Sequence, residues 1–460
     1  MASLNKSLKF MLLMILCLGS VSPSVRSDNG TKNLVDQSNC LNVPIDHFVS
    51  SINSTIQKLW KVTFFVSKFN NTSRHDLQVS GSLSHCLELL NTSAEELGWT
   101  VEALLNYDTE IGTGDLSSDL RTWLSSVLVN LDSCEESFDH GNSTIETSLE
   151  NELNKVASSV TQTIGMVDPK CHARDETCRP FWLEIRRRKL IWADKEPVNV
   201  VVALDGSGDF TSINDAVNSA PDRSPERFVV YVKKGVYKEY VKINKDKWNI
   251  VMIGDGMDAS IISGNRSTVD GRRSYDTATF CVKGRGFVAK YITFENKAGP
   301  ERHQAVAFLC DADVSALYRC GFKGYQDTLY PHKYRQFYKE CVITGTVDFI
   351  FGRASAVFQD CQIIARKGLP KQKNAITAQG RKHLSEFSGF SLQSCSITVS
   401  PEVVADSVET YLGRPWKEYS TTVIMQSNIS SAISPQGWLP WAGNFALDTL
   451  YYGEYMNRGS

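Results

Sequence analysis

Tyr318-Arg-Cys-Gly-Phe322 is the first of four similar stretches in the second half of the chain. The others are Tyr338-Lys-Glu-Cys-Val-Ile343, Phe358-Gln-Asp-Cys-Gln-Ile363 and Leu392-Gln-Ser-Cys-Ser-Ile397, and Met425-Gln-Ser-Asn-Ile429 is a fainter copy. The cysteines, and the asparagine of the last copy, follow one another at steps of 21, 20, 34 and 33 residues. A period near 20 residues with insertions is typical of a parallel β-helix, in which each coil stacks on the previous one. The alternative is an ordinary β-sandwich with accidental similarity.

The repeat predicts that two aspartates occupy equivalent positions on successive coils and so stack on each other. Asp327 lies seven residues after Cys320, and Asp348 lies seven residues after Cys341. Neighbouring strands are about 4.8 Å apart, so equivalent positions on successive coils bring the two carboxyl groups to roughly that separation. Two carboxyl groups this close do not both ionise freely, which gives an acid and a base from one residue type. The alternative is that each aspartate only caps a turn.

The same register stacks Cys341 on Cys361, and we expect their Cα atoms to lie within disulfide range. The chain has twelve cysteines, and eleven remain beyond Cys17. Cysteine usage at this level suits an oxidising compartment.

The first residues have the pattern of a signal peptide, which we expect over residues 1–24. Lys6 and Lys9 precede a short apolar run from Phe10 to Gly19, which is too short to span a bilayer. Eight Asn-x-Ser/Thr sequons agree with secretion and are candidate glycosylation sites. They are at Asn29, Asn53, Asn70, Asn71, Asn91, Asn142, Asn265 and Asn428.

Residues 34–167 are predicted to be helical. Apolar residues recur at helical spacing from Leu83 to Leu90 and from Leu120 to Leu128, and glycines and prolines are sparse. Helices with no strand-like run between them predict a small bundle. A linker over 168–190 follows and ends in Arg186, Arg187, Arg188, Lys189 and Leu190. This basic run is either a solvated face or a protease site. Its position between a predicted helical region and a β-rich region favours cleavage by a protease.

Residues 191–460 read as short β-rich runs with a net charge of +4, whereas the preceding residues have a net charge of −6. A basic region suits a polyanionic substrate, and the acidic region could lie against it. No Cys-x-x-Cys pair or histidine cluster has zinc spacing, so we expect no metal site. No concentrated basic and aromatic patch indicates nucleic-acid binding.

Five segments resemble, in order, the signature segments of plant pectin methylesterases. They are Gly235-Val-Tyr237-Lys-Glu239, Gln304-Ala-Val-Ala-Phe308, Gly324-Tyr-Gln326-Asp327-Thr-Leu329, Asp348-Phe-Ile-Phe-Gly352 and Leu412-Gly-Arg414-Pro-Trp416. Phe308 is the one departure seen, because the family usually has leucine there, and this change affects packing only. The stretches that contain Cys86 and Cys134 resemble the pectin methylesterase inhibitor domain.

The resemblance implies a mainly β chain, with a right-handed parallel β-helix catalytic domain over 191–460 preceded by an all-α four-helix-bundle pro-domain. It implies that Asp348 is the nucleophile and that Asp327 is the general acid and then the base. Gln304 and Gln326 would stabilise the oxyanion, and Arg414 would hold Asp348. The implied substrate-binding residues are Ser274, Gln304, Arg414 and Trp416.

The resemblance further implies disulfides Cys86–Cys134 and Cys341–Cys361 and a cut after the basic run. The implied substrate is methyl-esterified homogalacturonan, or pectin, and no cofactor is needed. A monomer secreted to the cell wall is expected, with a processing protease and proteinaceous pectinesterase inhibitors as partners.

Two other functions remain open. Carboxyl groups about 5 Å apart also suit a retaining glycosidase, but the Gly-His-Gly and Arg-Ile-Lys segments of β-helical polygalacturonases do not occur in this sequence. A non-catalytic wall-binding or inhibitory protein would be favoured if Asp327, Asp348 or Arg414 were replaced, and all three are present.

Overall fold

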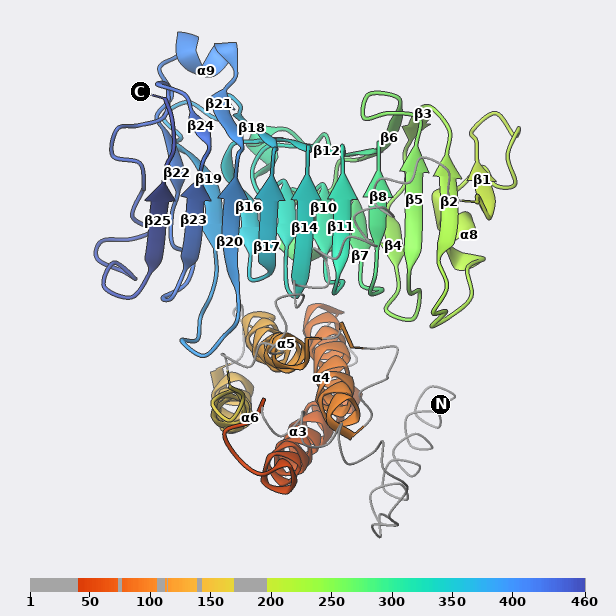
Figure 1. Cartoon of the computed structure of the whole chain (residues 1–460), viewed down its shortest axis with the longest axis vertical. Helices are drawn as coiled ribbons and strands as arrows, with labels where there is room; N and C mark the ends of the chain where they lie inside the picture. The colour runs from red at the N-terminus through yellow and green to blue at the C-terminus, as the bar shows by residue number, and fades with distance from the viewer. Residues whose placement is uncertain are drawn as a thin grey trace.

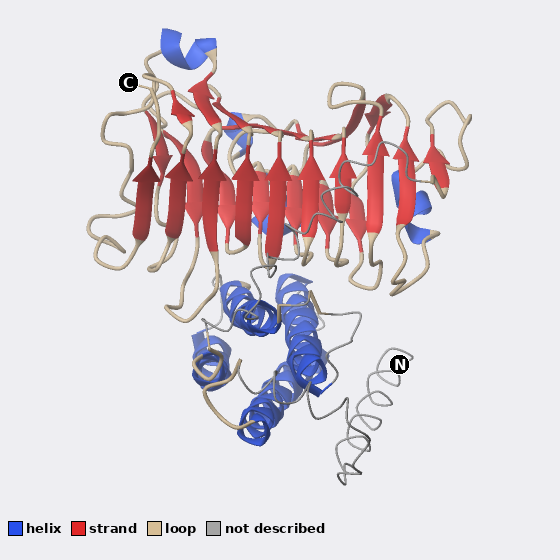
Figure 2. Ribbon diagram, in the orientation of Figure 1, coloured by secondary structure: helices blue, strands red, loops and turns tan. Residues whose placement is uncertain are grey.

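The computed structural model describes residues 40–72, 77–105, 112–113, 115–138, 143–168 and 197–459. A helical domain lies beneath an elongated β domain (Figures 1 and 2). The expected signal peptide, the basic processing run, Asn29 and Asn142 lie outside the described residues. Within the described ranges, no helix combines the length and apolar character needed to cross a membrane.

Among the described residues, the helical domain has four long helices around one core. They are α3 (Ile45–Thr72), α4 (Leu77–Leu105), α5 (Leu116–Glu136) and α6 (Ser143–Ile164). α5 begins at Leu116 because the Asp115 side chain accepts a hydrogen bond from the backbone N–H of Ser118 at 3.0 Å. Its apolar residues at helical spacing, among them Leu120 and Leu124, are fully buried. The predicted bundle is confirmed.

A disulfide joins α4 to α5 through Cys86 and Cys134, which are 48 residues apart in the chain. Cys40 is also disulfide-bonded. Because the six other described cysteines are free, the partner of Cys40 lies outside the described residues.

The β domain is built from three parallel sheets that run the length of the molecule (Figure 1). The ten-stranded sheet contains β1 (Val200–Val202), β2 (Phe228–Val232), β5 (Ile250–Gly254), β8 (Val288–Lys290), β11 (Ser315–Tyr318), β14 (Arg335–Lys339), β17 (Ser355–Gln359), β20 (Gly389–Gln393), β23 (Thr421–Met425) and β25 (Tyr451–Tyr455). The seven-stranded sheet contains β4 (Val241–Ile243), β7 (Phe280–Val282), β10 (Phe308–Cys310), β13 (Leu329–Pro331), β16 (Val347–Gly352), β19 (Asn374–Gln379) and β22 (Thr410–Gly413). The eight-stranded sheet contains β3 (Gly235–Tyr237), β6 (Ser260–Gly264), β9 (Thr293–Asn296), β12 (Gly321–Lys323), β15 (Val342–Gly345), β18 (Gln362–Ala365), β21 (Ser396–Val399) and β24 (Asn428–Ile429).

Successive strands of the chain enter the three sheets in turn, so the predicted parallel β-helix is confirmed. The repeat marks its coils, because Gly321, Val342, Gln362 and Ser396 are register partners and each follows a cysteine of the repeat. Aromatic rings stack inside the coils, with 5.5 Å between the ring centres of Phe280 and Phe308. The short helix α8 (Ile213–Asn218) lies near β1, and α9 (Pro401–Ala405) lies on the edge opposite the helical domain (Figure 1).

The expected Cys341–Cys361 disulfide is absent from the structure, where both residues are buried free thiols. Their stacking is as the repeat predicts, but each sulfur contacts backbone carbonyls instead. The Cys341 Sγ lies 3.5 Å from the Leu317 carbonyl oxygen, and the Cys361 Sγ lies 3.5 Å from that of Tyr338. Cys320 and Cys395 extend the column on either side and are also free.

Replacing both Cys86 and Cys134 by alanine should destabilise the helical domain by about 4 kcal/mol, because the bond closes a long loop of the unfolded chain. Scanning calorimetry should show the helical transition at a lower temperature, with the β-helix transition unchanged. Reductant should lower the same transition in the parent protein and have no further effect on the double variant. Equal transition temperatures in the two proteins would contradict this role.

Candidate active site

Asp327 and Asp348 lie next to each other on the seven-stranded sheet. Leu329 of β13 is the register partner of Ile350 of β16, so the residues two positions earlier, Asp327 and Asp348, occupy equivalent places on neighbouring coils. The backbone N–H of Asp327 donates to the carbonyl of Val347 at 3.1 Å, which fixes this alignment. Both side chains are buried.

The backbone at both aspartates is left-handed, with φ of 61° at Asp327 and 52° at Asp348. Aspartate tolerates this conformation better than most non-glycine residues do. In the pairing of β16 with β19, three steps from Val347 to Ile350 face two steps from Ala375 to Thr377. The extra residue is a β-bulge beside Asp348, and such bulges redirect a side chain that would otherwise follow the pleat.

Arg414 holds Asp348 through two hydrogen bonds. It follows directly after β22, and its Nε and Nη2 donate to the two carboxylate oxygens of Asp348 at 2.8 and 2.7 Å. The guanidinium also lies 4.3 Å from the ring centre of Trp441. Paired hydrogen bonds of this kind fix both the orientation and the charge of a carboxylate.

The surroundings push the pKa values of the two carboxyl groups apart. Burial and the nearby charge of Asp348 raise the pKa of Asp327 well above its usual range. Burial also raises the pKa of Asp348, but the hydrogen bonds and charge of Arg414 oppose that rise. The pKa of Asp327 is raised further than that of Asp348, which favours the proton on Asp327 and the negative charge on Asp348.

Gln304 and Gln326 line the same cleft as the aspartates. The Oε1 of Gln304 accepts a hydrogen bond from the Thr268 hydroxyl at 2.8 Å, which leaves the amide NH₂ group to donate elsewhere. Gln326 directly precedes Asp327. Two amide donors beside a charged carboxylate can stabilise negative charge that develops on a bound carbonyl oxygen.

The cleft has a volume of about 780 Å³ and an aromatic wall. Ser274 and Trp416 line it, as the resemblance implied. Four further aromatic residues also line it and were missed by the sequence analysis: Tyr275, Tyr330, Phe351 and Trp441. Phe351 and Tyr330 lie within or next to recognised segments, and their rings stack with centres 4.1 Å apart. Nothing in the sequence around Trp441 marks it.

The helical domain also lines this cleft, through His85, Ser133, Glu136 and Ser137. The Ser133 hydroxyl lies 3.3 Å from Nε2 of His332, and Glu136 accepts from Lys417 at 2.5 Å. Lys417 follows Trp416, so this ion pair joins the helical domain to the wall of the cleft. Burial and nearby cations lower the pKa of His85 to about 4, so this imidazole is neutral above that pH.

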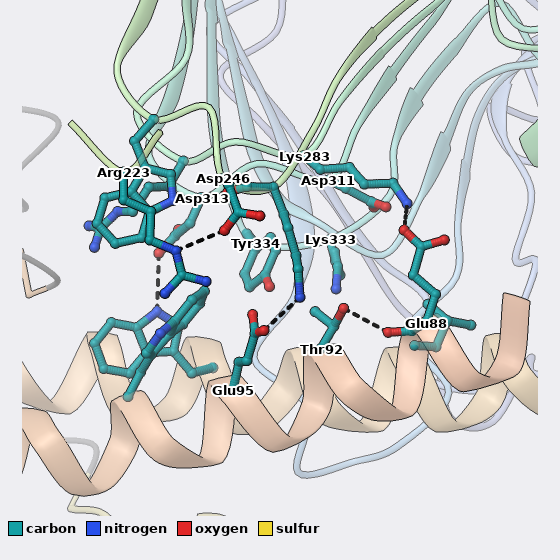
Figure 3. A pocket seen from close by; sticks show the side chains of 16 residues that line it. Glu88, Thr92, Glu95, Arg223, Asp246, Lys283, Asp311, Asp313, Lys333 and Tyr334 are labelled. Atoms are coloured by element: carbon teal, nitrogen blue, oxygen red, sulfur yellow. Dashed lines mark hydrogen bonds and ion pairs between the residues drawn. The ribbon is translucent and has the colours of Figure 1, made fainter. Parts of the chain in front are cut away.

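Further ion pairs hold α4 against the β-helix (Figure 3). Glu88 accepts from Lys283 at 2.5 Å, and Glu95 accepts from Lys245 at 2.6 Å. From α5, the indole N–H of Trp123 donates to Asp313 at 3.3 Å.

The turn between β13 and β14 inserts into the helical bundle. Tyr334 is part of the bundle's hydrophobic core, and its hydroxyl donates to the fully buried Glu96. Lys333 donates to Glu96 at 3.2 Å and to Asn130 at 2.7 Å. Removing one partner of such a buried pair leaves an uncompensated charge, so this turn fixes how the two domains fit together.

A loop between β19 and β20 forms the other side of the interface. Asp132 of α5 pairs with Lys382 of this loop at 3.0 Å and with Arg353, which follows β16, at 2.6 Å, and its carboxylate lies 3.0 Å from Nε2 of His383. The backbone N–H of Phe387 donates to the Ser125 hydroxyl at 2.8 Å. In the ion pairs described between the two domains, the cation belongs to the β-helix and the anion to the helices. The acidic region thus lies against the basic one, as the charge asymmetry suggested.

Comparison with known proteins gives two family matches. Residues 199–460 match the pectinesterase family model, and residues 15–166 match the model of the plant invertase/pectin methylesterase inhibitor family. The pectinesterase/pectinesterase inhibitor PPE8B of Prunus persica is 52% identical over 428 residues, which cover 92% of this chain and 82% of that protein. The probable pectinesterase/pectinesterase inhibitor 32 of Arabidopsis thaliana is 46% identical over 475 residues, covering 99% of this chain and 89% of that protein.

Among solved structures, pectin methylesterase from carrot has a TM-score of 0.57 and 50% sequence identity. The matched region covers 58% of this chain and 84% of the carrot chain.

Replacing Asp348 by asparagine should lower the pKa of Asp327, because it removes a like charge and frees Arg414 to act on Asp327. Infrared titration of the carboxylic C=O band in protein labelled with ¹³C-aspartate would measure this. Asp360→Asn is the matched control, since Asp360 is exposed and pairs with Lys339 instead. If the protonated band of Asp327 titrates at the same pH in the parent and in Asp348→Asn, the two groups are not coupled.

Proposed function

This chain belongs to the pectinesterase family and is a carboxylic-ester hydrolase that acts on pectin, and we propose that it uses Asp348 as nucleophile and Asp327 as proton carrier. The observation that supports this most strongly is the pair itself. The carboxyl group of Asp348, held by Arg414 through two hydrogen bonds, lies beside that of Asp327, whose pKa is raised well above its usual range. One group can attack while its neighbour donates.

In the first half of the reaction, a carboxylate oxygen of Asp348 bonds to the ester carbonyl carbon and the carbonyl oxygen becomes an oxyanion. Gln304 and Gln326 donate hydrogen bonds to that oxyanion. The bond from carbon to the methoxy oxygen then breaks, and the proton of Asp327 moves to this oxygen, so methanol leaves. The product is an acyl anhydride between Asp348 and the sugar carboxyl group.

In the second half, water attacks the acyl carbon and Asp327, now a carboxylate, takes a proton from it. The bond to the Asp348 oxygen breaks, which regenerates the charged Asp348 and releases the free carboxyl group of the sugar. Asp327 is protonated again, so the pair returns to its starting state. The reaction needs no group from outside the chain other than water.

The aromatic wall fits a substrate made of sugar rings, because Tyr330, Phe351, Trp416 and Trp441 offer flat apolar faces beside the aspartates. A retaining glycosidase would share the carboxyl pair. Membership of the pectinesterase family favours methyl-ester hydrolysis instead, and so do the amide groups of Gln304 and Gln326, which can stabilise an ester oxyanion. Methanol release without new reducing ends separates the two activities.

We further propose that the helical domain keeps the enzyme in a less active precursor form. Four of its residues line the cleft that holds Asp327 and Asp348, so a long polysaccharide meets the helices before it reaches the aspartates. The proposal also includes secretion of the protein to the cell wall as a monomer. A protease would then cleave the linker. The sequons remain predicted glycosylation sites; Asn91, Asn265 and Asn428 are exposed.

Asp348→Asn should abolish methanol release from esterified pectin, since an amide is a poor nucleophile at this centre. Gln326→Ala should reduce kcat by about 10²–10³-fold, the usual effect of removing one oxyanion donor. Methanol would be measured after controlled cleavage of the linker, with circular dichroism to confirm folding. Asp360→Asn should be fully active. Parent-level activity in Asp348→Asn would refute the nucleophile assignment.

Asp132→Lys should increase methanol release by the intact precursor. It places a cation against Arg353, Lys382 and His383 and weakens domain docking by about 3–5 kcal/mol, as removal of a buried ionic partner does. Glu152→Lys is the control, because Glu152 pairs with Lys155 of its own helix and takes no part in the domain contacts described above. Activity should be compared before and after linker cleavage. Equal precursor activity in the parent, Asp132→Lys and Glu152→Lys would show that docking does not limit the enzyme.

A further inference from the structure

The outward face of the ten-stranded sheet carries one continuous apolar row. Strand pairing aligns six residues on six successive strands: Val229, Val251, Val288, Ala316, Phe337 and Val357. The next residue on each strand, such as Val230 or Met252, belongs to the core inside the coils. Because side chains alternate along a strand, the row faces away from that core.

The three valines of the row on β2, β5 and β8 are far more buried than an open sheet face allows, whereas Ala316 and Val357 are partly exposed. The exposed fraction is 0% for Val251, 3% for Val229 and 5% for Val288. These residues form their own hydrophobic cluster with Ile253 and Ala316, and every described member belongs to this same face. Neighbouring side chains on one sheet shield the flanks of a valine and leave its top open, so burial this complete requires a covering segment.

The burial of a charged side chain beside the row also indicates a covering segment. Lys290 follows Val288 by two positions on β8, so it also points outward, and yet it is only 2% exposed. An ammonium group is buried only where an anionic or polar partner accompanies it. The covering segment therefore has both apolar and acidic or polar groups.

The described residues on either side of the linker, which from here on means residues 169–196, lie at this sheet. At its start, the backbone carbonyl of Asp168 accepts from the Ser117 hydroxyl at 2.8 Å. Ser117, Phe337 and Val357 line one groove of about 460 Å³ between α5 and the sheet, so the linker begins beside the row. At its end, the chain resumes at Pro197 and enters β1, the terminal strand of this sheet (Figure 1).

We propose that the apolar row is the docking surface of the linker, residues 169–196. From β17 to β2 the row spans five strand spacings, about 24 Å, which this segment can cross several times over when extended. The linker has two apolar triplets, Phe181-Trp182-Leu183 and Leu190-Ile191-Trp192, and acidic residues that suit Lys290, including Glu184 and Asp194. The triplets cover the row, and the four charges of Arg186 to Lys189 between them stay in water because an apolar surface cannot solvate them.

This placement has a consequence for a cut in the basic run. The first triplet would remain joined to the helical domain and the second to the β-helix. The intact linker therefore attaches the helical domain to the sheet at a second place, away from the ion-paired interface, and a single cut removes that attachment.

Photo-crosslinking of the full chain tests the contact directly. With p-benzoylphenylalanine in place of Val251, peptide mapping should find crosslinks to residues 181–192. The same group in place of Gln362, an exposed residue on β18 of the eight-stranded sheet, should give none to the linker. Crosslinks from position 251 only to other peptides, or to none, would overturn the proposal.

Hydrogen exchange of the full chain gives a second test. In Val251→Asp, amides of 181–185 and 190–193 should exchange about tenfold faster than in the parent, whereas Gln362→Asp should match the parent. If Val251→Asp does not fold, the linker variant Trp182→Ser/Trp192→Ser serves instead, and it should bind an apolar dye at the uncovered row. Unchanged exchange in a folded Val251→Asp, or no added dye binding by the linker variant, would reject this docking surface.

Discussion

Coil-to-coil register is the constraint on which the site depends. Parallel strands bond to one another only at fixed spacing, so residues at equivalent places in successive coils must stack. The step from Cys320 to Cys341 equals the step from Asp327 to Asp348, and the pairing of Leu329 with Ile350 carries that step through the site. Two acids are thereby held together without any direct bond between them. The like charge and the buried setting then raise the pKa of Asp327 well above its usual range, which is the property that the proposed chemistry would use.

The helical domain is held beside the site by ion pairs, whereas the two aspartates are held together by the register of the coils. Its acidic side chains meet basic ones from the loops and strand ends at one edge of the β-helix, and several of these pairs are almost fully buried. Lys333 and Glu96 illustrate the consequence, because each would lack its partner if the domains separated. A domain held in this way is specified closely in position, since a small shift would leave several charges unpaired at once.

The sequence predicted the parts of this molecule that repeat and little of what does not. The fold class, the stacked cysteines and the adjacent aspartates all follow from one period. The bulge and the left-handed backbone that aim Asp348 do not, because they are local departures from the period. Trp441 comes from a segment without regular structure, and His85 and Ser133 reach the cleft only through domain docking, which no pattern within either domain encodes. The predicted Cys341–Cys361 bond shows the same limit: the repeat establishes proximity, but proximity does not decide whether two thiols are oxidised.

The coil between Cys361 and Cys395 has 34 residues, against 20 and 21 in the two before it. Much of the excess lies in the loop that carries Lys382, His383 and Phe387 down to the helices, while the strands on either side keep the common register (Figure 1). This part of the contact with the helical domain is thus made by a loop that carries neither of the two aspartates. Because the strands on either side keep their register, this loop can change in length or sequence without moving Asp327 and Asp348 relative to each other.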